Sequence, residues 1–320
     1  MQPKEIIIMN KPKNALIIGN GFDLDLGLET KFSHFANAKN YWPEKDGSKL
    51  SSFLDSRKSM EKWFDMEGAL REYAITQKGP FGEPNAINEE QINADFEYLK
   101  KIRLGLMKYL VKEEQKDILR DSTAAKVLMG INNNSRFEYV YTLNYTDLNV
   151  FCNKLNIGNF EEIRYLHGNL ANKDIIIGID DLKLKNPYKN WRKSRSPFYK
   201  SNNIFADLNS SSEIVFFGVS FGMIDYKYFK QFFSKVATPV LEPIPINEKK
   251  YITIFTFDEN DRLSILDFLE QMKVDIDYLF NQTHFEIIRT KEHQDEKKVE
   301  AFLERLRKNR PSPLAMPFGD

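Results

Sequence analysis

The chain has 320 residues, of which 42% are hydrophobic, enough for a full core in one large domain or in one domain with an insertion. Its 46 basic side chains balance 46 acidic ones, which argues against a nucleic-acid-binding protein with a basic surface. A single cysteine, Cys152, excludes a disulfide framework and a cysteine-built zinc site, and no apolar run approaches the length of a transmembrane helix. We therefore expect a cytoplasmic protein, because the opening residues also lack the pattern of a signal peptide.

Short apolar runs predict the strands of a sheet. In chain order they are Ala15–Ile18, Glu138–Tyr141, Ile163–Leu166 and Glu213–Phe217, with Ile175–Ile179 and Tyr251–Phe255 as further candidates. Near-continuous apolarity is typical of strands covered on both faces, as in a parallel sheet.

Helical periodicity fills the region between the first two strands. Residues 51–77 and 89–119 have it, and Gly79–Pro84 between them has the composition of a turn. The order of elements predicts an α/β fold, an open, mostly parallel sheet with a helical insertion, residues 40–130, after the first strand. We expect one domain over residues 1–320, a closing helix near Glu296–Lys308 and a flexible tail over residues 310–320.

The first candidate site is the glycine turn that follows the first strand, Gly19-Asn20-Gly21-Phe22-Asp23. Glycines let the backbone approach a phosphate, and the helix that follows offers unpaired N–H groups. The motif is not the complete dinucleotide fingerprint, because its third glycine would fall at Leu24. The alternative is a tight strand-to-helix turn in which Asp23 is a helix N-cap.

Polar residues also follow the second and third strands, where ligands of open α/β sheets bind. After the second strand, Asn144 can donate and accept hydrogen bonds at once, so it can orient a water or an amide. Thr146 and Asp147 have the alternative of capping the next helix. After the third strand, His167 precedes a glycine and is suited to proton transfer near neutral pH.

The fourth strand runs into Gly218-Val219-Ser220-Phe221-Gly222, which has the spacing of a nucleophile elbow. The esterase interpretation is disfavoured, because only His284 and His293 follow the serine and no oxyanion glycine segment precedes it. Ser220, with Asp225 at the start of the next helix, serves equally well as a phosphate or ribose contact.

Three other features have less specific interpretations. The segment Asp181–Lys200 alternates cations with aromatic residues, so it is either a solvated loop or lid, which the neutral net charge favours, or a nucleic-acid contact. Asp65 and Glu67 do not share a helix face, so they do not form a catalytic carboxylate pair, and Glu67 either reaches the crevice or lies at the surface or in packing. We expect Cys152 to be buried.

Taken together, these motifs resemble the bacterial AbiH family, which is associated with abortive infection, a suicidal defence against phage. The resemblance spans residues 16–229. It rests on the glycine turn with the following Gly27-Leu28, Thr30 and Phe32, on Trp63-Phe64-Asp65-Met66-Glu67, on Asn144-Tyr145-Thr146-Asp147, on His167-Gly168, and on Gly218, Ser220 and Asp225.

The order of motifs is also similar, at longer range, to the sirtuin-like superfamily, whose members bind NAD and cleave its nicotinamide–ribose bond. This resemblance implies a Rossmann or sirtuin-like sheet, with Asn144 positioning the attacking water or the carboxamide and His167 as general base on a ribose hydroxyl. It implies that the nucleotide is held by Gly19, Asn20, Gly21, Asp23, Thr30, Thr142, Asp147, Gly218, Ser220 and Asp225. The four zinc cysteines of the deacetylases and the arginine after their glycine turn have no counterpart here, so a protein deacylase is disfavoured and no metal is expected.

The resulting hypothesis is an antiphage abortive-infection effector that binds NAD and hydrolyses it. The alternative is a nucleotide-binding sensor or regulatory subunit of a defence system, without turnover. The expected partners are NAD or a related nucleotide and a second copy of the chain or a defence-system protein, with a phage-derived trigger as a further candidate. Neither a membrane nor nucleic acid is an expected partner.

Overall fold

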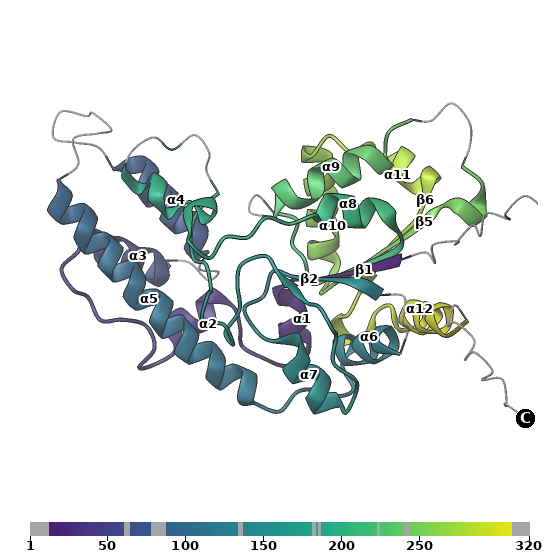
Figure 1. Cartoon of the computed structure of the whole chain (residues 1–320), viewed down its shortest axis with the longest axis horizontal. Helices are drawn as coiled ribbons and strands as arrows, with labels where there is room; N and C mark the ends of the chain where they lie inside the picture. The colour runs from purple at the N-terminus through teal and green to yellow at the C-terminus, as the bar shows by residue number, and fades with distance from the viewer. Residues whose placement is uncertain are drawn as a thin grey trace, which may run out of the picture.

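A computed structural model describes residues 13–60, 65–77, 88–133, 137–180, 184, 187–222, 225–239 and 244–308. Six described strands form one open sheet in the order β3-β2-β1-β4-β5-β6, and every pairing between them is parallel. The strands are β1 (Lys13–Ile18), β2 (Phe137–Thr142), β3 (Arg164–Tyr165), β4 (Ser211–Phe217), β5 (Lys250–Thr256) and β6 (Thr283–Arg289). This is the strand order of the Rossmann fold, so the predicted α/β class and open parallel sheet are confirmed (Figure 1).

One predicted strand is absent from the sheet, and one strand of the sheet was not predicted. Residues 175–179 form no strand and make only an isolated bridge, from Ile179 to Arg192. Their isoleucines are buried instead in the core of the helical insertion, where a β-branched apolar run packs without a ladder. The edge strand β6 was not predicted, because His284 and Glu286 alternate with apolar residues and interrupt the continuous run that marks a central strand.

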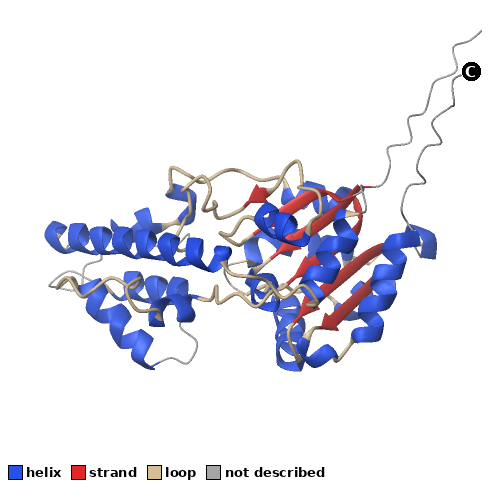
Figure 2. Cartoon of the chain, turned by 90° about the horizontal axis from the view of Figure 1, so that it is seen from below, coloured by secondary structure: helices blue, strands red, loops and turns tan. Residues whose placement is uncertain are grey.

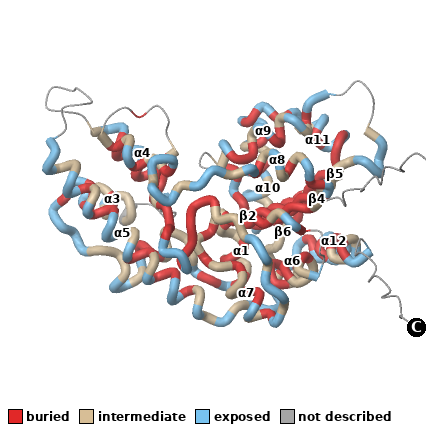
Figure 3. The backbone as a smooth tube through the Cα atoms, viewed as in Figure 1, coloured by how far each residue is buried: buried red, intermediate tan, exposed pale blue. Residues whose placement is uncertain are grey.

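Helices cover both faces of the sheet. Along β1, Ile17 faces one layer while Leu16 and Ile18 face the other, as the two-residue period of a strand requires. The first layer contains α8 (Ile204–Ser210), α9 (Tyr226–Val236), α10 (Glu259–Gln271) and α11 (Ile276–Gln282). The second contains α1 (Asn20–Asp25), α6 (Thr123–Asn132), α7 (Leu148–Leu155) and α12 (Glu296–Lys308). The strands between them are the most continuously buried part of the chain (Figure 3).

The remaining helices form a separate lobe beside the sheet (Figure 2). They are α2 (Phe32–Asn37), α3 (Lys49–Met60), α4 (Met66–Thr76) and α5 (Glu89–Gln115), all between β1 and β2. They share their own hydrophobic cluster, which the segment from Leu170 to Trp191 completes. The predicted turn at Gly79–Pro84 lies outside the described residues.

The middle of the basic and aromatic segment, residues 187–193, is not a solvated lid, whereas Phe198 beyond it is exposed. Residues Pro187–Trp191 and Lys193–Arg195 form two 3-10 helices, η1 and η2, and Tyr188 and Trp191 are buried against Tyr73 and Phe96 of the insertion. These two aromatic rings are therefore unavailable for stacking on nucleic-acid bases. The segment folds inward because its aromatic residues complete an apolar core, whereas its composition alone resembles that of an exposed loop.

Near the C-terminus, α12 covers the residues predicted for the closing helix, and Cys152 is buried as expected. The predicted flexible tail, residues 310–320, lies outside the described residues. Two short 3-10 turns, η3 (Ile246–Glu248) and η4 (Lys291–His293), complete the connections. Within the described ranges, no helix is both long and apolar enough to cross a membrane.

Candidate functional site

The glycine turn after β1 packs directly against the end of β4. The Gly19 N–H donates to the Phe217 carbonyl at 2.9 Å, and the Gly21 N–H donates to the Gly218 carbonyl at 3.0 Å. A Cβ atom at Gly19 would lie 2.5 Å from the Gly218 carbonyl oxygen, and one at Gly21 would lie 2.6 Å from the Gly218 Cα. The first and fourth predicted motifs therefore meet at the switch point of the sheet, and this close backbone approach requires their glycines. Contact with a phosphate stays a prediction.

Asn144 ties the end of β2 to this turn. Its Nδ2 donates to the Gly19 carbonyl at 3.1 Å and to Asp23 Oδ1 at 2.8 Å, while Thr146 Oγ1 donates to Asp23 Oδ2 at 2.8 Å. Since both partners of Nδ2 are acceptors, the orientation of the amide is determined. Both amide hydrogens are thus engaged within the protein, so Asn144 has only its Oδ1 to offer a ligand.

Asp23 is buried at the centre of this network, and burial raises its pKa to about 7. The hydrogen bonds from Thr146 and Asn144 oppose the shift but are outweighed by the loss of solvation. The alternative of Asp23 as an N-cap is wrong, because Gly19 has that position and Asp23 lies in the first turn of α1. Asp23 is therefore a carboxyl group that changes charge near neutral pH beneath the glycine turn.

The other predicted residues near β2 and the glycine turn make hydrogen bonds within the protein. Thr142 Oγ1 accepts the Asn144 N–H at 3.0 Å, and Thr30 Oγ1 donates to Asn20 Oδ1 at 2.6 Å. Asp147 is the N-cap of α7, where it accepts from the Asn149 N–H, so its capping alternative is confirmed. Contact of these residues with a nucleotide is untested.

His167, at the end of β3, lies in a second buried network that reaches into the insertion. Lys193 Nζ lies 3.3 Å from His167 Nε2 and 2.8 Å from Glu67 Oε1. The side chains of Lys193 and Glu67 are 1% and 7% exposed, so this is a buried ion pair. Glu67 is therefore not a surface residue, and it contacts the residues at the end of β3; its access to a ligand crevice stays a prediction.

Burial is the main cause of a pKa of His167 well below its usual value, and the charge of Lys193 lowers it further. The imidazole is therefore neutral near pH 7, and its Nε2 accepts a hydrogen bond from Lys193. The pKa of Glu67 rises to about 7, because its loss of solvation outweighs the attraction of Lys193. Glu67 is therefore only partly ionised near neutral pH.

Polar and charged groups from the segment after β4, from the start of α9 and from Asp180 lie near the histidine network. Ser220 Oγ donates to Asp225 Oδ2 at 3.2 Å, and Lys227 Nζ lies 2.5 Å from Asp180 Oδ1. No histidine contacts Ser220 among the described residues, and His284 lies at the amino end of β6, away from the edge where Ser220 lies. The disfavoured hydrolase triad is therefore not formed.

A family model described as "Bacteriophage abortive infection AbiH" matches residues 15–242. The chain belongs to the AbiH family. Membership implies a role in abortive infection by bacteriophage. A comparison with curated proteins finds no match. The matched range contains both networks at the sheet edge, whereas β5, β6 and the helices α10 to α12 follow it.

The site of this AbiH protein includes residues that the sequence did not single out. Lys193 was one cation among several in a basic segment, and Asp180 and Tyr228 carried no motif. Their place depends on the insertion and α9 meeting at the end of β3. No local pattern indicates such a meeting.

Two negative observations bound the site. A pocket of about 790 Å³ opens elsewhere, between residues 29–41 and helix α5, and none of the predicted site residues lines it. In the described part of the chain, no three His, Cys, Asp or Glu side chains are grouped so that they could hold a metal ion. The groups that the sheet edge offers for chemistry are therefore those of its two buried polar networks.

Proposed function

We propose that this AbiH-family protein is an abortive-infection effector that binds NAD at the carboxyl edge of its sheet and hydrolyses the nicotinamide–ribose bond. One observation carries the proposal. Asn144 and His167, from adjacent strands, are both buried at the edge of a sheet with the Rossmann strand order, where dinucleotides bind. The similarity of the motif order to sirtuin-like proteins supplies the choice of NAD.

The reaction replaces the bond from ribose C1′ to the nicotinamide nitrogen with a bond from C1′ to a water oxygen. Nicotinamide leaves with the bonding electron pair, and the water loses one proton. Because nicotinamide is a cationic leaving group, the transition state resembles an oxocarbenium ion, which needs a held ribose, nearby negative charge or dipoles, and limited access of bulk water. His167 is neutral and therefore free to accept a proton, although its lowered pKa makes it a weaker base than an exposed histidine. Asn144 fixes the turn at which the nucleotide is expected.

Lys193 sets a condition on this mechanism. Its ammonium group occupies Nε2 of His167, so the ring can take a proton only when Lys193 shifts toward Glu67. Such a requirement suits an effector that stays inactive until infection. It equally favours the second candidate, a nucleotide-binding sensor of a defence system in which His167 never accepts a proton.

The test is release of nicotinamide from NAD by the purified protein, beside Asn144→Ala and His167→Ala. General base catalysis contributes on the order of 10²–10⁴-fold, so we expect His167→Ala to lower the rate by at least about 100-fold. His284→Ala, at the opposite edge of the sheet, is the control and should keep the full rate. Equal rates in wild type and His167→Ala would contradict the proposed base.

Where the wild type releases no nicotinamide, a titration with NAD on the same sample tests the binding that both candidates require. If the wild type and His167→Ala both bind NAD, the result supports either the sensor or an effector without its trigger. Absence of binding contradicts both.

A further inference from the structure

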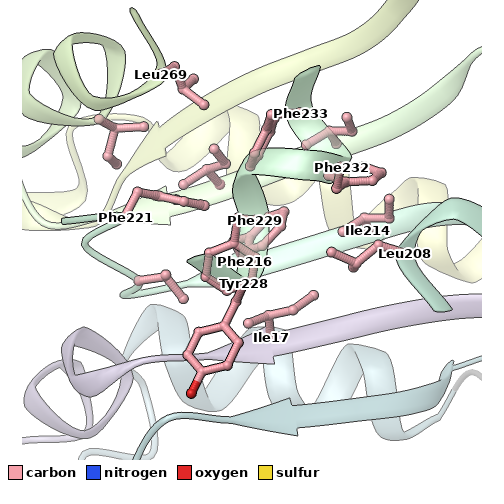
Figure 4. Close-up of a cluster of buried hydrophobic side chains, with 14 of the residues drawn as sticks. Ile17, Leu208, Ile214, Phe216, Phe221, Tyr228, Phe229, Phe232, Phe233 and Leu269 are labelled. Carbon is pink, nitrogen blue, oxygen red and sulfur yellow. The ribbon is translucent and has the colours of Figure 1, made fainter. Parts of the chain in front are cut away.

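Tyr228, on α9, has a buried hydroxyl group that lacks a hydrogen-bond partner in the described part of the chain. The residue is 6% exposed, and its oxygen makes no hydrogen bond to any described residue. Its ring borders the phenylalanine cluster around Phe216 and Phe229, but the hydroxyl points away from that cluster (Figure 4). The rings of Tyr228 and His167 lie near each other, with centroids 6.1 Å apart.

Asp180 provides a second unsatisfied atom in the same region. Its Oδ1 pairs with Lys227, whereas Oδ2 is buried and has no partner within the described residues. Lys227 Nζ, which pairs with Asp180 Oδ1, also lies 4.8 Å from the centre of the Tyr228 ring, so Asp180 and Tyr228 share one neighbouring cation. The two unsatisfied atoms therefore belong to one polar cluster beside His167.

The chemistry of these atoms limits the ligand. A buried polar atom without a partner is uncommon and calls for an explanation such as a binding role. A carboxylate oxygen only accepts hydrogen bonds, while a phenol can donate as well. Together they match neighbouring hydroxyl groups, one donating to Asp180 and one accepting from Tyr228.

Hydrogen-bond chemistry argues against a phosphate at the same place. The cluster contains three carboxyl groups, on Glu67, Asp180 and Asp225, against the lysines Lys193 and Lys227. Burial leaves Glu67 about half ionised near pH 7, so the lysines nearly balance the other carboxylates. Oδ2 of Asp180 nevertheless only accepts hydrogen bonds, so it suits a hydroxyl group and cannot bond an ionised phosphate oxygen.

We propose that Asp180 and Tyr228 bind the two hydroxyl groups of a ribose, the one that carries nicotinamide in NAD. The inference rests on the proposed function and adds to it the residues that hold the reacting sugar. The hydroxyl of the sugar nearest Asp180 donates to Oδ2, and its neighbour accepts from the Tyr228 hydroxyl. The sugar then lies beside His167 and Lys193, so a ligand at this subsite also competes for the contact between them.

The test compares two probes by titration calorimetry, ADP-ribose and AMP. ADP-ribose has the second ribose, whereas AMP has only the adenosine half. We expect Tyr228→Phe and Asp180→Asn each to weaken ADP-ribose binding about tenfold and to leave AMP binding unchanged, because each removes a hydrogen bond to the second ribose alone. Tyr226→Phe, two positions along α9, is the matched control and should bind both probes as the wild type does.

Each other result overturns a defined part of the proposal. Unchanged ADP-ribose affinity in both variants rejects the subsite while nucleotide binding stands. Equal losses for ADP-ribose and AMP in folded variants reject the assignment to the nicotinamide-side ribose. A wild type that binds neither probe rejects the proposed function, and the subsite with it. Where Asp180→Asn fails to fold, Tyr228→Phe carries the test, since it removes a single oxygen atom.

Discussion

At the residue scale, Asp23 combines deep burial with two hydrogen-bond donors. Asn144 and Thr146 each donate to one of its carboxylate oxygens, yet the loss of solvation dominates and raises its pKa to about 7. In the unfolded chain the pKa is near the usual 3.8. The folded protein therefore retains a proton on Asp23 over a range of pH in which the unfolded chain has lost it.

This difference predicts how stability depends on pH. The contribution of Asp23 is fully present below about pH 4 and is lost as the pH rises through 7, because the unfolded chain binds fewer protons in that window. Asp23→Asn has no proton to lose at this position. We therefore expect the free energy of unfolding of wild type, relative to Asp23→Asn, to fall by about 2–3 kcal/mol between pH 5 and pH 8.

Urea unfolding at several pH values measures this difference. The control is Asp277→Asn, an exposed residue on α11, whose profile should run parallel to that of the wild type. Parallel profiles for wild type and Asp23→Asn would show that Asp23 ionises alike in the folded and unfolded chains.

At the scale of elements, the buried pair of Glu67 and Lys193 joins α4 of the insertion to the 3-10 helix η2 beside the sheet edge. Breaking a buried pair by removing one partner leaves an uncompensated charge, which costs about 3–5 kcal/mol. Removing both charges avoids that cost. The pair therefore stabilises the packing of the insertion against the sheet edge beside His167.

Lys193→Met should lower the free energy of unfolding by about 3 kcal/mol, and Glu67→Gln combined with Lys193→Met should restore a large part of it. A double-mutant cycle by urea denaturation measures the coupling. Lys100→Met, which breaks the exposed Lys100–Glu97 pair on α5, is the control and should change stability far less. Additive effects at positions 67 and 193 would contradict a coupled buried pair.

At the scale of the whole molecule, the family match and the folded sheet have different extents. The match ends at residue 242, before β5. Residues Glu213–Phe217 of β4 pair with β5. Residues beyond it contribute to both layers, among them Ile252 and Ile254 on one face and Phe255, Ile288 and Phe302 on the other. The matched region by itself would leave β4 as an unpaired edge and both layers open.

A chain that ends at residue 242 should therefore lack a cooperative unfolding transition and bind the dye ANS, as an incompletely packed core does. The control ends at Lys308, which keeps every described strand and α12. Circular dichroism during urea titration and ANS fluorescence measure the difference. A sharp transition in the shorter chain would mean that the matched region is a folding unit without β5 and β6.

Much of the fold follows from local sequence. Continuous apolar runs predict β1, β2, β4 and β5, because central strands of a parallel sheet need apolar residues on both faces. Polar residues directly after such runs predict the sheet edge, where Asn144 and His167 are found. The motifs spread over this edge also carry the resemblance to AbiH proteins that the family match confirms.

What local sequence does not determine is the neighbour of each polar side chain. Lys193 has the sequence context of a solvated cation, yet α4 brings Glu67 against it. Tyr228 has the context of a core aromatic residue, yet its ring lies beside His167 and its hydroxyl has no hydrogen-bond partner among the described residues. Ile175–Ile179 looks like a strand, but the insertion offers it an apolar core and no ladder. Sequence by itself therefore determined the sheet, its edge and the family, since these depend on patterns along the chain. Only the tertiary structure decided which charges are buried together, because burial and pairing depend on residues that are distant in sequence and adjacent in space.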